Sequence, residues 1–253
     1  MPDSNGSVTA TVADGIATVS FFHPKGNSLP ASVLKRLAEA ITEVGTNDDA
    51  RVVVLRSEGS GPFCAGASFD ELAAIETHRM GIDFFMGFAR LILAMRSCPK
   101  FIVTRVQGKV AGGGVGMVAA SDFAVAMDTS SVKLSELAIG IGPFVVGPVI
   151  ERKIGLGAFT TLAVDADFFS AEWAMQHGLY SKVAETVAEL DSLVGTIVKK
   201  LHTANPEAMA MMKQIFWQGT EHWDTLLPER AAMSGQLVLS DFTRNAITRF
   251  KAK

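Results

Sequence analysis

Short apolar segments alternate with helical patterns along the first two thirds of the chain, and this alternation is the strongest constraint on the fold. Apolar residues recur every three or four positions between Pro30 and Gly45, and a second helical stretch runs over residues 81–96. The segments with the composition of buried strands are residues 16–22, 51–57, 101–106 and 123–127. Strands that alternate with helices pair in parallel through crossover connections, so the sequence predicts an α/β fold.

The sequence changes character after about Ser170. Residues 171–179 and 205–217 have helical spacing, and no further run has the composition of a strand. No internal repeat or low-complexity linker separates the two parts. We therefore expect an α/β core in residues 1–169 and a helical region in residues 170–253 that packs on the core and on neighbouring subunits.

Composition and charge exclude several functional classes. A formal net charge of −3 does not supply the positive field that non-specific nucleic-acid binding requires. The two cysteines form no CxxC pair and no two histidines stand four residues apart, so neither a disulfide framework nor a metal site is indicated. The longest uncharged apolar stretch, residues 137–150, is shorter than the ~18 residues of a membrane span. With a polar N-terminal segment that lacks a secretion signal, these features predict a cytoplasmic protein.

The glycine run in residues 110–122 (VAGGGVGMVAASD) presents backbone N–H groups that suit an anion. A P-loop is excluded because no Lys-Ser or Lys-Thr pair follows the glycines. Gly114, Gly116 and Ala119 match the dinucleotide-binding pattern GxGxxA, with Asp128 beyond the next strand. However, the pattern does not follow its strand directly, and the helix that it opens is only about two turns long, shorter than a crossover helix.

A second turn of small residues, 60–72 (SGPFCAGASFDEL), follows the strand predicted over residues 51–57. In a parallel sheet the loops after successive strands emerge at the same edge, so this turn and the glycine run can face each other. Two backbone N–H groups, one from each turn, would stabilise an oxyanion that forms during a reaction.

Three segments resemble motifs of the crotonase superfamily, the enoyl-CoA hydratase/isomerase family: FCAGASFDEL (63–72), VQGKVAGGGVGMVAASDFAVA (106–126) and LSELAIGIGP (134–143). The resemblance extends from about residue 10 to the end of the chain. It implies a crotonase-like (ClpP/crotonase) α/β fold of repeated ββα units with a C-terminal helical region, and a homotrimer or hexamer. It also implies an acyl-CoA thioester substrate and a role in fatty acid metabolism, with CoA entering as part of the substrate and no tightly bound cofactor or metal.

The same resemblance places the catalytic groups. In this family two backbone N–H groups hold the thioester carbonyl oxygen, and these positions fall on Ala67 and Gly113. Hydratases of the family use two glutamates, whose positions fall on Gly116 and Glu136, so one of the two carboxylates is missing here. Ser68 stands where the family usually has Asp, and serine is itself a good helix N-cap.

Further residues are expected to contact the substrate. Phe144, in the loop after Glu136, is expected near the acyl chain, and Lys25 and Lys109 are expected to attract the negative charges of CoA. The full expected set is Lys25, Ala65, Ser68, Phe69, Lys109, Gly112, Gly116 and Phe144.

A single carboxylate favours a reaction that removes a proton from one carbon and returns it to another. The sequence therefore predicts a Δ3,Δ2-enoyl-CoA isomerase that uses Glu136 as its acid and base. The alternatives are an enoyl-CoA hydratase (a lyase) that acts on a 2-enoyl-CoA, possibly branched, and a non-catalytic acyl-CoA binder.

Overall fold

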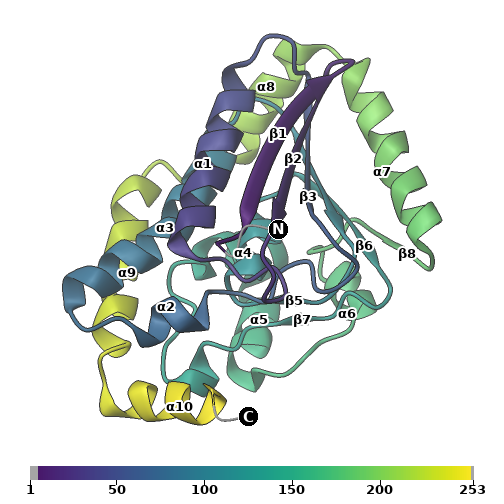
Figure 1. Ribbon diagram of the computed structural model, residues 1–253. Helices are drawn as coiled ribbons and strands as arrows, with labels where there is room; N and C mark the ends of the chain where they lie inside the picture. Colours follow the sequence, from purple (N-terminus) through teal and green to yellow (C-terminus); the bar gives the residue numbers. More distant parts are fainter. Residues whose placement is uncertain (1–4, 252–253) are drawn as a thin grey trace.

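A six-stranded sheet forms the centre of the computed structural model, which describes residues 5–251 (Figure 1). Its strand order is β1-β2-β3-β4-β6-β8, and every neighbouring pair from β2 onward is parallel, whereas β1 and β2 are antiparallel. The strands are β1 (Ser7–Ala13), β2 (Ile16–Phe22), β3 (Val52–Ser57), β4 (Ile102–Val106), β6 (Phe123–Met127) and β8 (Lys182–Ala184). The predicted α/β fold is confirmed.

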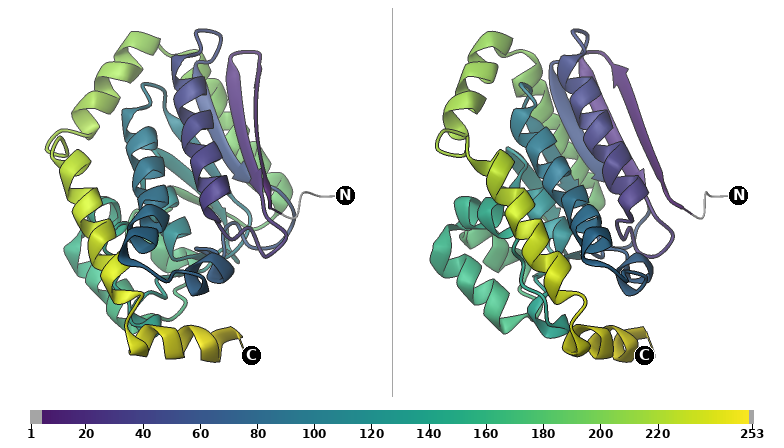
Figure 2. Two further views of the ribbon diagram at one scale, coloured as in Figure 1. Left: turned by 60° about the vertical axis from the view of Figure 1, so that its left-hand side comes forward. Right: turned by 90° about the vertical axis from the view of Figure 1, so that its left-hand side faces the viewer.

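Helices cover both faces of this sheet (Figure 2). On one face lie α1 (Ala31–Thr46) and α3 (His78–Ser97), and α9 (Trp223–Leu237) runs alongside α3. On the other face lies α7 (Val187–His202), which packs on β3, β4 and β6. Successive residues of β3 point to opposite faces, so Val53 and Leu55 join the first core whereas Val52 and Val54 join the second. Burial on both faces explains the continuous apolar composition of the central strands.

A second, two-stranded sheet lies beyond the ends of the main strands. It pairs β5 (Val110–Ala111) with β7 (Val132–Lys133) in parallel, and α4 (Gly113–Ala119) starts directly after β5. This small sheet holds the glycine run next to the segment that leads to Glu136.

The remaining elements connect and cover these layers. They are α2 (Phe69–Ala73), the 3-10 turn η1 (Leu137–Ile139), α5 (Gly147–Asp165), α6 (Ala171–Gln176), α8 (Pro206–Phe216) and α10 (Asp241–Lys251). The N-caps of α2, α3, α6, α7 and α8 are Ser or Thr hydroxyls or an Asn carbonyl that accept backbone N–H groups, which explains why the chain enters a helix at these positions.

The expectation that no strand follows Ser170 was wrong. The strand β8, at residues Lys182–Ala184, pairs in parallel with β6 and closes one edge of the main sheet. Three residues are too few to show a periodic pattern, so only the pairing with β6 identifies this strand. Within residues 5–251, no helix is long and apolar enough to cross a membrane.

Candidate functional site

Backbone hydrogen bonds join the two turns of small residues. The N–H of Cys64 donates to the carbonyl of Lys109 over 3.3 Å, and the N–H of Ala111 donates to the carbonyl of Cys64 over 2.8 Å. On the far side, the N–H of Gly112 donates to the carbonyl of Lys133 over 2.9 Å. Three segments that are distant in the sequence are therefore fixed side by side by main-chain pairing.

Glycines at 66 and 112 make this close approach possible. Gly66 has φ +94° and Gly112 has φ +51°, a region of backbone conformation that disfavours residues with a side chain. A Cβ atom on Gly66 would also come within 3.3 Å of the Ala111 carbonyl oxygen. Glycine is thus required at both positions by the backbone conformation, and at Gly66 also by the close approach of the two turns.

The backbone N–H groups of Ala67 and Gly113 remain available in this arrangement. Neither donates to a backbone carbonyl among residues 5–251, because Ala67 lies between the two hydrogen bonds of its bridge to Leu29, and Gly113 is the first residue of α4. Both residues line the same cavity. The arrangement offers two donors to an oxygen atom placed in that cavity.

Glu136 also lines this cavity, and its carboxyl group is buried. Its Oε2 atom has no hydrogen-bond partner among the described residues, and its Oε1 atom lies close to Gly112, 3.3 Å from where a Cβ of that glycine would stand. Burial raises the pKa of the Glu136 carboxyl well above its ordinary value, to about 7, although backbone N–H groups of Glu136 and Ser135 oppose the shift. A carboxyl group with this pKa can both take up and release a proton near neutral pH.

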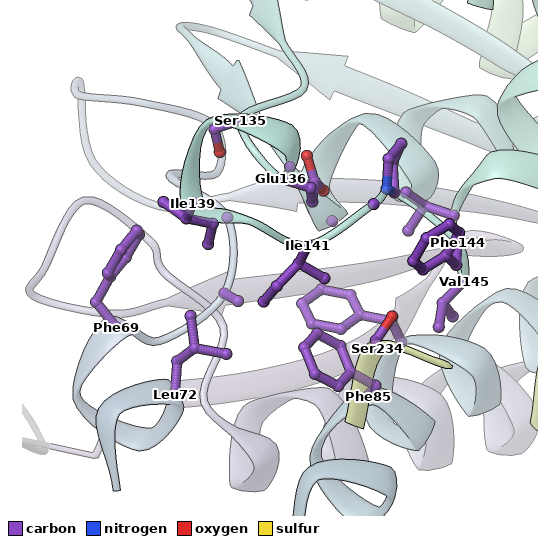
Figure 3. Close-up of a pocket in the computed structure, with 18 of the residues that line it drawn as sticks. Phe69, Leu72, Phe85, Ser135, Glu136, Ile139, Ile141, Phe144, Val145 and Ser234 are labelled. Atoms are coloured by element: carbon purple, nitrogen blue, oxygen red, sulfur yellow. The ribbon is translucent and has the colours of Figure 1, made fainter. Parts of the chain in front are cut away.

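We call this space the inner cavity; its volume is about 60 Å³ (Figure 3). Figure 3 shows Glu136 on one side and Phe85 and Ser234 on the opposite side, with Phe69 and Phe144 at opposite ends. Apart from Glu136, its lining is almost entirely apolar or glycine. Its walls are formed by Ala65, Gly66, Ala67, Phe69, Leu72, Phe85, Phe88, Gly112, Gly113, Ser135, Glu136, Ile139, Ile141, Gly142, Pro143, Phe144, Val145, Val146 and Ser234.

Gly116, expected to contact substrate, does not line the inner cavity. It lies in α4 against Val146, whose side chain fills the adjacent space, and a Cβ at Gly116 would come within 2.6 Å of Val146 Cγ1. Glu136 is therefore the one carboxylate among the described residues that line the cavity.

A larger groove of about 530 Å³ adjoins the inner cavity and shares Ala65, Phe69, Ser135 and Ile139 with it. Lys109 lines this groove as predicted, and its Nζ atom lies 5.0 Å from the centre of the Phe168 ring. Lys133 and Arg249 add two further cations. We call it the cationic groove; its lining is Pro62, Cys64, Ala65, Phe69, Lys109, Ala111, Lys133, Ser135, Ala138, Ile139, Phe168, Ala246 and Arg249.

Two expected substrate-binding residues have other contacts in the structure. Lys25 lines neither space and instead forms an ion pair with Asp70 at the surface. The Ser68 hydroxyl accepts the N–H of Glu71 and caps α2, the role in which serine commonly replaces aspartate. Ala65, Phe69, Gly112 and Phe144 do line the inner cavity.

Sequence reasoning missed Lys133, Arg249, Phe85 and Ser234. Lys133 follows a two-residue strand and Arg249 lies on the last helix, so only the folded chain brings them to one groove. Phe85 and Ser234 belong to the apolar faces of α3 and α9, where a cavity-lining residue has the same pattern as a core residue. Among the described residues, no group of three His, Cys, Asp or Glu side chains is arranged to hold a metal ion.

Comparisons of this chain with known proteins all point to one protein family. The family model described as enoyl-CoA hydratase/isomerase matches residues 11–252. A (7aS)-7a-methyl-1,5-dioxo-2,3,5,6,7,7a-hexahydro-1H-indene-carboxyl-CoA hydrolase of Rhodococcus jostii (strain RHA1) is 30% identical over 83% of this chain and 80% of that protein. A short-chain-enoyl-CoA hydratase of Clostridium acetobutylicum is 28% identical over 94% of this chain and 92% of its own. The crystal structure of an enoyl-CoA hydratase from Mycobacterium avium superposes with a TM-score of 0.86 at 26% identity, covering 99% of this chain and 97% of that one.

Proposed function

The chain belongs to the enoyl-CoA hydratase/isomerase family, and from that premise we propose that it moves the double bond of a 3-enoyl-CoA to the 2-position. The observation that carries this proposal is the single buried carboxylate of Glu136 beside two available backbone N–H groups. The other acid position that the resemblance implies is occupied by Gly116, and the space beside it is filled by Val146.

In the first step Glu136 removes a proton from C2 of the substrate. The electron pair of the broken C–H bond passes to the thioester carbonyl and gives a dienolate, whose oxygen accepts hydrogen bonds from the N–H groups of Ala67 and Gly113. Each such preorganised donor contributes roughly 3 kcal/mol to stabilising the developing charge. The carboxylate becomes a neutral carboxylic acid.

In the second step the same carboxyl group returns its proton to C4. The double bond then lies between C2 and C3, the carbonyl is restored, and Glu136 is again a carboxylate, so protons and electrons balance. A pKa of about 7 suits both halves, because the group is ionised often enough to act as the base and acidic enough to act as the proton donor.

The cationic groove suits the CoA part of the substrate. CoA carries several phosphate charges, and Lys109, Lys133 and Arg249 line this groove, which shares Ala65 and Phe69 with the inner cavity. A thioester that enters from the groove would bring its carbonyl to the two N–H groups and its acyl group into the apolar part of the inner cavity.

Hydration of a 2-enoyl-CoA is the second candidate function. It is supported by the hydratase of Clostridium acetobutylicum, which aligns with this chain over most of both lengths. It would require Glu136 alone to activate water, in a cavity whose lining is mostly apolar.

The two functions are separated by incubating the protein with a 3-enoyl-CoA and, separately, with a 2-enoyl-CoA. We expect 2-enoyl-CoA from the first and little 3-hydroxyacyl-CoA from the second, both measured by chromatography. Glu136→Gln should lower the isomerisation rate at least about 100-fold. The matched control is Glu172→Gln on the surface of α6, which should retain full activity. Hydration as the faster reaction, or an unimpaired Glu136→Gln variant, would overturn the proposal.

A further inference from the structure

We propose that the side chain of Phe144 limits the length of the acyl group, by closing the inner cavity against a second apolar cavity behind it. This inference rests on the proposed function only in taking the inner cavity as the acyl site.

The inner cavity is small. Its volume of about 60 Å³ is far below the 530 Å³ of the cationic groove. Phe69, which also lines the cationic groove, lies at one end of the inner cavity, and Phe144 lies at the opposite end (Figure 3). An acyl group that enters from the groove would therefore extend toward Phe144.

A second space, the outer cavity, lies on the other side of this wall and is open to solvent, because Leu137, Val164 and Phe242 in its lining are more than half exposed. Its volume is about 490 Å³, and its lining includes no charged side chain among the described residues. The lining is Leu137, Gly140, Ile141, Gly142, Pro143, Phe144, Ala163, Val164, Leu237 and Phe242. It shares the four consecutive residues 141–144 with the inner cavity, so this short segment alone forms the common wall.

Phe144 supplies the largest side chain of that wall. Gly142 has no side chain, and Phe144 folds its ring back over Gly142 so closely that a Cβ there would overlap the ring. The backbone beneath is held by the Phe144 N–H, which donates to the Gly142 carbonyl over 2.8 Å, and by the Gly147 N–H, which donates to the Pro143 carbonyl over 2.7 Å. The wall thus combines a fixed backbone with one half-buried aromatic ring.

Removal of the ring should join the two cavities. With the ring in place, the wild-type protein should bind short acyl groups best. A variant with a small residue at 144 should instead accept a longer chain whose end lies in the outer cavity. Because each buried methylene group favours binding, the gain should grow with chain length until the outer cavity is filled.

The test measures binding of saturated butanoyl-CoA and decanoyl-CoA by isothermal titration calorimetry, with free CoA as the reference. For Phe144→Ala we expect the affinity for decanoyl-CoA relative to butanoyl-CoA to rise at least tenfold over wild type. Phe144→Leu, a milder change that keeps the wall partly filled, should give a smaller rise in the same direction. Phe144→Trp should give none.

A second substitution shows where the longer chain lies. Val164 lines the outer cavity and is mostly exposed, so Val164→Phe alone should leave the wild-type profile unchanged. In the Phe144→Ala background it should remove most of the gain for decanoyl-CoA. The inference is overturned if folded Phe144→Ala and Phe144→Leu both keep the wild-type ratio, or if Val164→Phe leaves the gain intact.

Saturated thioesters cannot be isomerised, so this readout is independent of the reaction. A length preference that changes at residue 144 in a protein without isomerase activity would contradict the proposed reaction and support the Phe144 wall. Isomerase activity together with an acyl-length preference that does not change with residue 144 would support the proposed reaction and contradict the Phe144 wall.

Discussion

The Cα atom of Gly116 lies directly against the side chain of Val146. A Cβ at position 116 would stand 2.6 Å from Val146 Cγ1 and 2.7 Å from Val146 Cβ, closer than real Cβ atoms approach. The position at which the resemblance predicts another acid thus carries no side chain and lacks the space for one.

Replacement of Gly116 by Glu should therefore destabilise the protein by about 1–3 kcal/mol through overpacking. The double variant Gly116→Glu/Val146→Gly should recover part of this loss and gain hydration activity on a 2-enoyl-CoA, because it restores a second carboxylate. Thermal unfolding and 3-hydroxyacyl-CoA formation measure the two effects. A Gly116→Glu variant as stable as wild type would show that Val146 does not fill this position.

The isomerisation rate should depend on pH through Glu136. The base must be ionised to begin the reaction, and its pKa is about 7, so the rate should fall as pH drops below about 7 and level off above it. This is tested by measuring kcat at a series of pH values from 5 to 9, with a substrate that does not titrate in this range. A midpoint near the ordinary glutamate value would assign the proton transfer to another group.

The same pKa shift affects stability. The folded protein holds the Glu136 proton more tightly than the unfolded chain, whose pKa is near 4.5, so wild type loses stability as pH rises from about 4.5 to about 7. At pH 8, Glu136→Gln should be more stable than wild type by on the order of 2 kcal/mol, and the difference should be small at pH 4.5. Urea unfolding at the two pH values tests this; equal differences at both would contradict it.

Gly113→Ala should impair the protein strongly, since the added Cβ would overlap the ring of Phe88. We expect a loss of about 1–3 kcal/mol of stability and of at least tenfold in isomerisation rate, because the shift would displace one N–H donor. Gly157→Ala, on the exposed side of α5 with no atom within 4 Å of the added Cβ, is the matched control; it should keep the isomerisation rate and be neutral or slightly stabilising. An active Gly113→Ala variant would remove that N–H group from the mechanism.

The crossing of α3 and α9 depends on two glycines. A Cβ on Gly235 would stand 2.8 Å from the backbone nitrogen of Ile82 and 3.0 Å from the carbonyl carbon of Gly81, and a backbone cannot move aside as a side chain can. Gly235→Ala should lower stability by about 1–3 kcal/mol, or several degrees in Tm. Gly195→Ala, exposed on α7, should be neutral or slightly stabilising. Equal Tm values for the two variants would show that the helices can separate without cost.

Much of the α/β core was predictable from the sequence because its strands are buried on both faces. Residues 52–55 and 123–127 are wholly apolar for that reason. The strand β1 shows no such pattern, since it is an antiparallel edge strand with many exposed positions, and three-residue β8 is recognisable only by its pairing with β6.

The candidate site was predictable in part. Both turns are visible as runs of small residues, because positive φ and close backbone approach require glycine. Glu136 was identified by resemblance alone, since an isolated glutamate carries no local pattern. The position of Val146 over Gly116, and that of Phe144 between two cavities, follow from tertiary packing that no local spacing encodes.

Main-chain pairing among the segments at Cys64, Val110 and Val132 fixes the turns that carry the two donors and the segment that leads to the acid. Side chains that line the inner cavity can therefore be exchanged while the backbone frame that aligns the reacting groups stays in place. A change of chemistry on this frame should then be sought in the residues that fill the space, such as those at 116 and 144–146, and not in the turns themselves.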